Sequence, residues 1–214
     1  MNDGSAATTA ELGTREPSLE TPLIGLTGGM GAGKSTALEE LRLLGAEVLS
    51  TDCVVHELFR CDRVRQALVE RWGPDVAPEG TIDRQAVAER AFATPEERKW
   101  LEGTLWPLVG ERVAVWLALA RAKEPSPRAA VVEMPLLFES GMDNACDATI
   151  AVFADDAVRL ERVAARGQVR TDERASRQLS QEEKARRATF AVRNDGTLDE
   201  LRRELSSVLD KLGR

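Results

Sequence analysis

Short apolar runs alternate with longer amphipathic segments along most of this chain. Runs with the length and composition of buried strands occupy residues 23–26, 46–49, 129–134, 149–153 and, more weakly, 189–192. The segments between them carry apolar residues at helical spacing, beginning with Ala37, Leu38, Leu41 and Leu44. Because strands that alternate with helices form a parallel sheet covered on both faces, the pattern predicts a three-layer α/β fold with a five-stranded parallel sheet.

A long helical insertion separates the second and third expected strands. About 75 residues there show helical periodicity and no convincing strand. This length exceeds that of an ordinary crossover connection, so we expect an inserted helical subdomain at residues 53–127. Residues 21–52 and 128–212 would then form the core that contains the sheet.

Prolines give the expected helix boundaries within this insertion. Thr94, Pro95 and Glu97 have the spacing of a capping box with proline at the first helical position, so a helix should begin there. Pro107 is expected to open a further helix. Residues 123–128, which include two more prolines, are expected to form the linker that returns to the sheet.

The charge balance argues against two classes of partner. The 214 residues carry a formal net charge of −7 and the pI is near 5.0, whereas general binding to nucleic acid or anionic membranes needs clustered Lys and Arg. The longest apolar run, at residues 113–120, is far shorter than the roughly 20 residues that span a bilayer. We therefore expect neither a nucleic-acid partner nor a membrane segment.

Cysteine spacing and the N-terminus bear on the cellular compartment. Cys53, Cys61 and Cys146 form no C-x-x-C pair, which predicts neither a zinc site nor a disulfide framework and suits the reducing cytoplasm. The first 20 residues are acidic and lack the apolar stretch of a secretory signal, so we expect a disordered tail. A homo-oligomeric assembly is left open by these features.

A glycine-rich octamer follows the first expected strand directly. Residues 28–35 fit G-x-x-x-x-G-K-[ST] between a strand and a helix, which is the context that a phosphate-binding loop requires. Its N–H groups would surround phosphate oxygens, Lys34 would contact the β- and γ-phosphates, and Ser35 would bind Mg²⁺. The sequence thus predicts a nucleoside triphosphate site formed by Gly29, Met30, Gly31, Ala32, Gly33, Lys34, Ser35 and Thr36.

Asp52 follows the second expected strand and therefore stands at the carboxyl edge of the sheet, beside the phosphate loop. A carboxylate there could accept the proton of an acceptor hydroxyl. Because Asp52 also precedes a helical pattern, it could equally serve as a helix N-cap. Glu133 ends the third expected strand and is open to two interpretations as well, a water-mediated contact with Mg²⁺ or a solvated side chain.

An arginine-rich segment stands out in this acidic chain. Residues 159–177 contain six arginines against three acidic residues, so anions should collect there. Arg162 and Arg166 are candidates for catalytic contact with a transferring phosphoryl group. Gly167 interrupts a continuous helix, which suits a mobile lid at about residues 162–178. A solvated helix face is the alternative.

Several motifs, in the same order, resemble the dephospho-CoA kinase family over residues 23–212. Residues 25–35 look like that family's phosphate loop, and residues 52–58 look like its acidic acceptor motif. Further similar stretches are Thr81-Ile82-Asp83-Arg84 with Phe92, the segment Pro135-Leu136-Leu137-Phe138-Glu139, and Arg162, Arg166, Arg174, Gln178, Asn194 and Gly196 at later spacings.

The resemblance implies an adenylate-kinase-like fold with a P-loop core, a helical acceptor domain and a closing lid. It also implies transfer of the γ-phosphoryl group of ATP to the ribose 3′-hydroxyl of dephospho-CoA, with Mg²⁺ bound at Ser35. By this resemblance Asp52 is the base and Asn194 contacts adenine. The residues implied to bind the acceptor are Asp52, Arg84, Pro135, Leu136, Leu137 and Glu139.

Two positions depart from the family's pattern. Ser50 stands where the family usually has the first of two acids, a change that bears on metal or acceptor contacts. Trp106 precedes Pro107 where the family often has histidine, so any polar role of that histidine is absent and the position is expected to be structural. The tryptophans of the insertion are more often packing residues than base-stacking residues.

Other functions share parts of this pattern. Another small-molecule kinase of the same architecture could act on a nucleoside monophosphate, shikimate or a sugar acid. A nucleotide-binding switch would need only the phosphate loop and a moving lid. A catalytically silent binding protein is disfavoured because Lys34 and Asp52 are both present. The large insertion and Asp52 together favour a kinase with a small acceptor.

Overall fold

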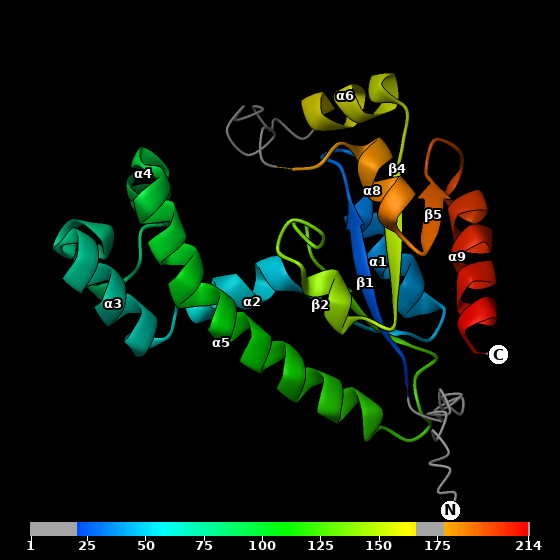
Figure 1. Cartoon of the computed structure of the whole chain (residues 1–214), viewed down its shortest axis with the longest axis horizontal. Coiled ribbons are helices and arrows are strands. Elements are labelled where there is room, and N and C mark those ends of the chain that lie inside the picture. Colours follow the sequence, from blue (N-terminus) through cyan, green and yellow to red (C-terminus); the bar gives the residue numbers. More distant parts are fainter. Residues whose placement is uncertain (1–20, 166–177, 214) are drawn as a thin grey trace, which may run out of the picture.

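A parallel sheet forms the centre of the protein, whose computed structural model describes residues 21–165 and 178–213 (Figure 1). The strand order is β2-β3-β1-β4-β5, and every neighbouring pair runs parallel. The fold class predicted from the sequence is confirmed, and each strand lies within about two residues of its expected position. The strands are β1 (Leu23–Gly28), β2 (Glu47–Ser50), β3 (Ala130–Glu133), β4 (Ala148–Phe153) and β5 (Phe190–Arg193).

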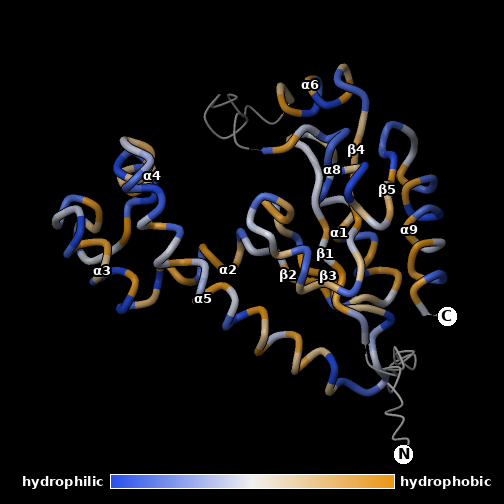
Figure 2. The backbone as a smooth tube through the Cα atoms, in the orientation of Figure 1, coloured by the Kyte–Doolittle hydropathy of each residue, from blue (hydrophilic) through white to orange (hydrophobic). Residues whose placement is uncertain are grey.

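Both faces of the sheet are covered because apolar residues occupy both sets of alternating positions in its inner strands. Ile24 and Leu26 of β1 belong to the cluster that contains α1 (Lys34–Leu43) and α9 (Leu198–Leu212). Leu23 belongs to the opposite cluster, with the C-terminal half of the long helix α5 (Pro95–Arg121). Figure 2 shows hydrophobic residues along the strands between these helical layers.

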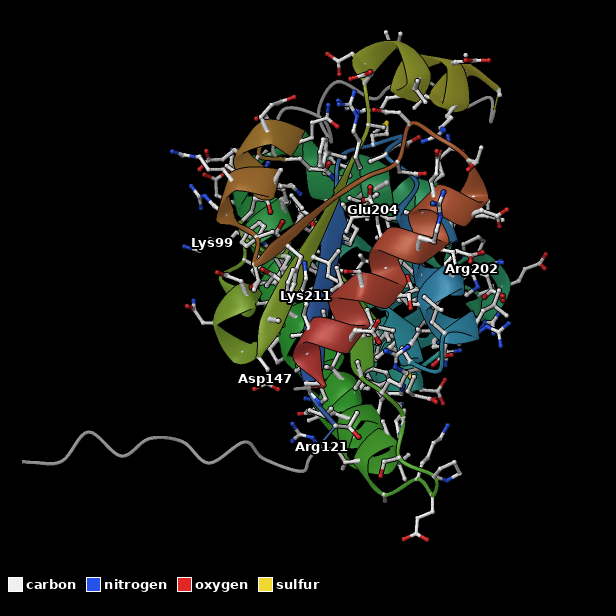
Figure 3. The ribbon with its side chains drawn as sticks, turned by 90° about the vertical axis from the view of Figure 1, so that its right-hand side faces the viewer. Lys99, Arg121, Asp147, Arg202, Glu204 and Lys211 are labelled. Carbon is white, nitrogen blue, oxygen red and sulfur yellow. The ribbon has the colours of Figure 1, made fainter. Side chains whose placement is uncertain are left out.

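An ion pair ties the two helices of one face together. Arg202, labelled on α9 in Figure 3, donates from Nε to Glu40 Oε2 of α1 at 2.6 Å. The Glu40 side chain is buried, and the pair compensates its charge. The shorter helices of this half of the molecule are α6 (Asp156–Ala165), α8 (Gln181–Arg187) and the 3₁₀ turn η3 (Met142–Ala145).

A second group of helices extends from the sheet and has its own apolar cluster (Figure 1). Val54, Leu68 and Val87 are buried in it, together with the N-terminal half of α5. The rings of Trp72 and Trp100 meet edge to face, with centroids 5.1 Å apart. The elements are α2 (Thr51–Leu58), α3 (Asp62–Trp72), η1 (Pro74–Val76), η2 (Pro78–Gly80), α4 (Arg84–Ala93) and α5.

Helix α5 begins where the sequence predicts, with one difference in its cap. Thr94 is the N-cap and its hydroxyl accepts a hydrogen bond from the backbone N–H of Glu97 at 3.2 Å. The Glu97 carboxylate accepts hydrogen bonds from Arg71 and from Trp72 Nε1. The expected capping box is therefore only half formed, because Glu97 binds α3.

The prediction that Pro107 opens a new helix is wrong. Pro107 lies inside α5, which is continuous over 27 residues. Proline costs one backbone hydrogen bond and a clash in a helix interior, but Leu105 and Val113 on either side of it are buried in the two apolar clusters. Packing on both sides therefore holds a helix that the local sequence disfavours.

No helix in the described part of the chain combines the length and the apolar composition that a bilayer crossing requires. The expected N-terminal tail, residues 1–20, and most of the expected lid, residues 166–177, lie outside the described residues.

Candidate active site

The phosphate-binding loop joins β1 to α1 at the carboxyl edge of the sheet. Gly33 is the N-cap of α1 with a φ of 93°, and no side chain caps this helix start among the described residues. The first N–H groups of α1 and its dipole are therefore directed at the loop, where an anion would be stabilised. Ser35 is exposed in this first turn, and Thr36 is half-buried beside it.

Lys34 folds back over the loop. Its Nζ donates to the carbonyl oxygens of Gly28 and Gly29, each at 3.1 Å. Burial lowers the pKa of Lys34 below its usual value of 10.5, and the carboxylates of Glu133 and Asp52 partly oppose this shift. The amine is thus held where phosphate oxygens would bind, with two carboxylates near enough to act on its charge.

Asn194 supports the loop from a distant part of the chain. It is buried after β5, and its Nδ2 donates to the carbonyl oxygen of Ala32 at 2.8 Å. A side chain at position 33 would overlap the Asn194 amide, and the positive φ of Gly33 also disfavours any other residue. Asn194 therefore acts as a brace for the loop. Its predicted contact with adenine stays a prediction.

Two arginines of α6 lie against the same loop. Arg159 Nε donates to the carbonyl oxygen of Met30 at 2.8 Å. Arg162 Nη1 is buried and has no hydrogen-bond partner among residues 21–165 and 178–213, and it would lie 3.7 Å from a Cβ placed on Gly33. A buried donor left without a partner costs free energy, and an anion at this point would satisfy it. Arg166, the other catalytic candidate, lies outside the described residues.

Asp52 lies in the first turn of α2, directly after β2, and its side chain is exposed. The N-cap of α2 is Ser50, so the alternative that Asp52 is the cap is wrong. Ser50 donates from Oγ to Glu133 Oε2 at 2.7 Å, across the paired ends of β2 and β3. An acid at position 50 would face the buried Glu133 carboxylate, so serine suits this neighbour.

A mostly apolar cleft of about 220 Å³ opens beside Asp52. Three elements contribute to it, namely α2, the middle of α5 and the segment that follows β3. Predicted acceptor residues Pro135 and Leu136 line it, and so does Trp106 of α5. The complete lining is Thr51, Asp52, Val55, Trp106, Val109, Gly110, Met134, Pro135, Leu136, Ser140 and Met142.

Two predicted acceptor residues serve other contacts. Leu137 is fully buried in the apolar cluster between α5 and the sheet, so it does not face the cleft. Glu139 pairs with Lys184 of α8, with Oε1 3.0 Å from Nζ, and accepts a hydrogen bond from the Leu179 N–H at 2.8 Å. Both residues therefore shape the segment after β3 from behind. Their assignment to direct acceptor contact stays a prediction.

Lys184 is a buried residue of the site that the sequence analysis missed. Its side chain has no exposed surface, and Nζ donates to the carbonyl oxygen of Pro135 at 2.5 Å. Burial lowers its pKa, although the hydrogen bond to Glu139 opposes the shift. Lys184 thereby joins α8 to the segment that lines the cleft, and a lone lysine in a charged helix gave no local sign of this role.

Arg84 is the first residue of α4 and is exposed to solvent, and it is not among the residues that line the cleft. Its Nη1 is 3.1 Å from Nδ1 of His56, and Arg60 Nη2 is 3.1 Å from Nε2 of the same ring. His56 follows Asp52 by one helical turn, so these groups share the face of α2 that carries the carboxylate. Two cations are therefore available near Asp52.

Oxygen ligands suited to Mg²⁺ are present, but they do not enclose an ion by themselves. In residues 21–165 and 178–213, no group of three or more His, Cys, Asp or Glu side chains could hold a metal. The Ser35 hydroxyl and the Glu133 carboxylate fit an ion that keeps several waters and binds phosphate oxygens, as Mg²⁺ commonly does.

Comparison with known proteins assigns the family. A model of the family described as dephospho-CoA kinase matches residues 22–200. The dephospho-CoA kinase of Deinococcus radiodurans is 37% identical over 206 residues, which cover 93% of this chain and 98% of that one. The chain belongs to the dephospho-CoA kinase family. The family member from Symbiobacterium thermophilum is 36% identical over 190 residues, covering 86% of this chain and 79% of that protein.

Two solved structures resemble the fold of this dephospho-CoA kinase family member. The crystal structure of TT1252 from Thermus thermophilus superimposes with a TM-score of 0.75 at 34% identity, covering 90% of this chain and 98% of that one. The dephospho-CoA kinase from Campylobacter jejuni gives a TM-score of 0.61 at 24% identity, with 90% and 97% coverage. At that identity, the second match shows the fold alone.

Arg159 is the other functional candidate that sequence reasoning did not single out. Arg159 belongs to the six-arginine segment, but only Arg162 and Arg166 were predicted to contact the transferring phosphoryl group. Arg159 lies three residues before Arg162, which places both on one face of α6. In this dephospho-CoA kinase family member that face is the one that touches the phosphate loop.

Proposed function

We propose that the protein transfers the γ-phosphoryl group of ATP to the ribose 3′-hydroxyl of dephospho-CoA, which gives CoA and ADP. The activity is that of the dephospho-CoA kinase family, to which the chain belongs. One observation carries the assignment of its site. Asp52 lines a cleft at the edge of the sheet where the phosphate loop also lies, and its carboxylate is near enough to Lys34 to oppose part of the lowering of the Lys34 pKa by burial.

On the donor side, the loop from Gly29 to Thr36 would hold the triphosphate through backbone N–H groups, Lys34 and the start of α1. Lys34 would exchange its two carbonyl partners for phosphate oxygens. Bound Mg²⁺ would neutralise charge on the β- and γ-phosphates, with the Ser35 hydroxyl as a ligand and Glu133 in contact through water.

On the acceptor side, Asp52 would accept the proton of the 3′-hydroxyl as that oxygen attacks the γ-phosphorus and the bond to ADP breaks. The exposed carboxylate is free to approach a ligand, and it stands at the rim of the cleft. Pro135 and Leu136 would contact the acceptor within the cleft. Arg84 would pair with the acceptor's diphosphate outside it.

Arginines of the segment after β4 would stabilise charge on the transferring group. The Nη1 of Arg162, which is buried beside Gly33 and has no partner in the described part of the chain, supports this role. We assign Arg166 to the same role, within a lid at about residues 162–178.

We also propose residues 53–127 as the acceptor-binding insertion in a core formed by residues 21–52 and 128–212. A cytoplasmic location and a homo-oligomeric state stay predictions.

The test is ADP release from purified protein with ATP and Mg²⁺, comparing dephospho-CoA with AMP, shikimate and no acceptor. We expect turnover with dephospho-CoA alone, and its loss in Lys34→Ala protein, because that change removes a cation from the phosphate site. Preference for another acceptor would contradict the substrate assignment. Equal release without any acceptor would indicate a nucleotide hydrolase or switch instead.

A further inference from the structure

Trp106 differs from the other tryptophans of the chain in its surroundings. Trp72 and Trp100 pack against each other, and Trp116 packs against the cluster between α5 and the sheet. Trp106 is 46% exposed, although Leu105 directly before it on α5 is buried. An exposed indole does not contribute the free energy that burial of its large apolar surface would provide.

The exposed indole forms a wall of the cleft beside Asp52. Asp52 and Val55 of α2 line the same cleft, and so does Leu136 from the segment after β3. The two hydroxyl groups of the lining are already engaged, since Thr51 Oγ1 donates to the Glu133 carbonyl oxygen at 3.0 Å and Ser140 Oγ donates to the Leu136 carbonyl oxygen at 2.8 Å. The Asp52 carboxylate is left to meet a polar group of the ligand. The rest of the lining is mostly apolar, so the cleft is suited to bind a ligand through a flat apolar face.

We propose that Trp106 stacks on the adenine base of the acceptor nucleotide and thereby selects a purine nucleotide as acceptor. The proposal rests on the proposed function, because it takes Asp52 as the group that meets the ribose 3′-hydroxyl. It assigns substrate selection to a position where the sequence predicted only a structural role.

The connectivity of the acceptor favours the base over its pantetheine arm as the occupant. In the ribose, the carbon that carries the base is separated from C3′ by C2′ alone, so the base must lie close to the reacting oxygen. The arm is joined at C5′ through a diphosphate, which needs cationic partners. Arg84 and Arg60 are exposed near His56, outside the cleft lining, so the diphosphate and the arm are drawn away from Trp106.

Kinetics of substituted proteins provide the first test. Stacking of a base on an aromatic ring is worth about 1–3 kcal/mol by alanine substitution, which corresponds to about a 5- to 150-fold change in affinity. Trp106→Ala should raise KM for dephospho-CoA by that factor, with kcat and KM for ATP nearly unchanged. Trp106→Phe should keep most of the affinity, whereas Trp106→Leu, which is apolar but cannot stack, should behave like the alanine variant.

Tryptophan fluorescence provides a readout that does not depend on catalysis. With the donor site filled by ADP, we add AMP, dephospho-CoA or 4′-phosphopantetheine to wild-type and Trp106→Phe proteins. AMP and dephospho-CoA should quench the wild-type emission, phosphopantetheine should not, and the Trp106→Phe protein should show no quenching. Trp116→Phe protein, whose removed ring is packed against the core, should quench like wild type.

The outcomes separate this proposal from the proposed function. Quenching by phosphopantetheine but not by AMP would place the arm on Trp106 and overturn the inference. An unchanged KM in Trp106→Ala and Trp106→Leu proteins that still turn over dephospho-CoA would overturn it while leaving the kinase activity intact. If wild-type protein does not phosphorylate dephospho-CoA, the proposed function fails, and AMP quenching that depends on Trp106 would still support base stacking.

Discussion

The donor and acceptor sides of this site are built in different ways. The phosphate loop is braced by Asn194, by Arg159 and by the folded-back Lys34, so its shape exists before any nucleotide binds. The acceptor cleft is lined by side chains from α2, α5 and the segment after β3, and Asp52 and Trp106 at its edge are exposed. The difference indicates a rigid triphosphate site beside an acceptor site that the ligand completes.

Arg162 provides the sharpest test of the donor side. Replacing Arg162 by alanine should lower kcat by about 10³- to 10⁵-fold, because an arginine at the transferring phosphoryl group contributes that much in related chemistry. Steady-state kinetics with saturating ATP and dephospho-CoA measures it. Arg203→Ala, which removes an exposed arginine from α9, serves as the control. A fall below 10-fold would place Arg162 outside the γ-phosphate site.

Asp52 provides the matching test of the acceptor side. Asp52→Asn should lower kcat by about 10²- to 10⁴-fold, the usual contribution of a general base, with KM for ATP unchanged. Glu57→Gln makes the same charge change at an exposed position of the same helix and should leave kcat unaltered. Similar losses in both variants would mean that the charge of α2, and not the position of Asp52, supports the reaction.

Lys184 joins α8 to the segment after β3 that lines the acceptor cleft. Replacing it should lower the free energy of unfolding. Lys184→Met leaves the Glu139 carboxylate without its cation and should lower the free energy of unfolding by about 3–5 kcal/mol. The double change Lys184→Met with Glu139→Leu should recover most of that loss, because it removes both charges. Urea denaturation measures both. Double-variant protein that is stable but has a higher KM for dephospho-CoA would show that Glu139 contacts the acceptor after all.

The reactivity of the cysteine thiols measures how accessible each region is to solvent. Burial raises the pKa of Cys146, beside β1, from 9.0 to about 11, whereas Cys53 is exposed on α2 next to Asp52. At pH 8, Cys146 should hold about 100-fold less thiolate than a thiol at 9.0 and react correspondingly slowly with iodoacetamide. Peptide mapping by mass spectrometry should find Cys53 alkylated first. Equal rates would mean that the sheet opens readily at this point.

The raised pKa of Cys146 also determines whether the stability of the protein rises or falls with pH. The folded state favours the neutral thiol of Cys146, so its contribution to stability is complete below pH 9.0 and is lost as the pH rises toward about 11. Cys146→Ala protein should lack this part of the alkaline loss of stability. Thermal unfolding at pH 8 and pH 10.5 measures the difference.

Features carried by local patterns could be predicted from the sequence. The five strands follow from short apolar runs, and the phosphate loop follows from eight consecutive residues. Contacts between distant residues gave no local signal. Lys184 meets Glu139 across 45 positions, and Ser50 meets Glu133 across 83. The acceptor cleft depends on such contacts, so the residues that line it were predicted less well than those of the loop.

Pro107 shows the opposite case, in which packing overrules a local signal and the prediction drawn from that signal is wrong. Proline disfavours a helix interior by about 3 kcal/mol or more. Side chains on both sides of it are buried in separate apolar clusters, and this burial holds the continuous helix. The same packing leaves Trp106 exposed on the face that meets the cleft.

The course of α5 has a mechanical consequence. One end of this helix is anchored among α2, α3 and α4, and the other end is anchored against the sheet. At Pro107 the backbone ladder lacks one hydrogen bond, and Gly103, whose carbonyl would have accepted it, has open space around it. Helix α5, which connects the two halves, should therefore bend most readily at Pro107, one residue away from Trp106. A ligand that pushes on the wall of the cleft would bend the helix at this point.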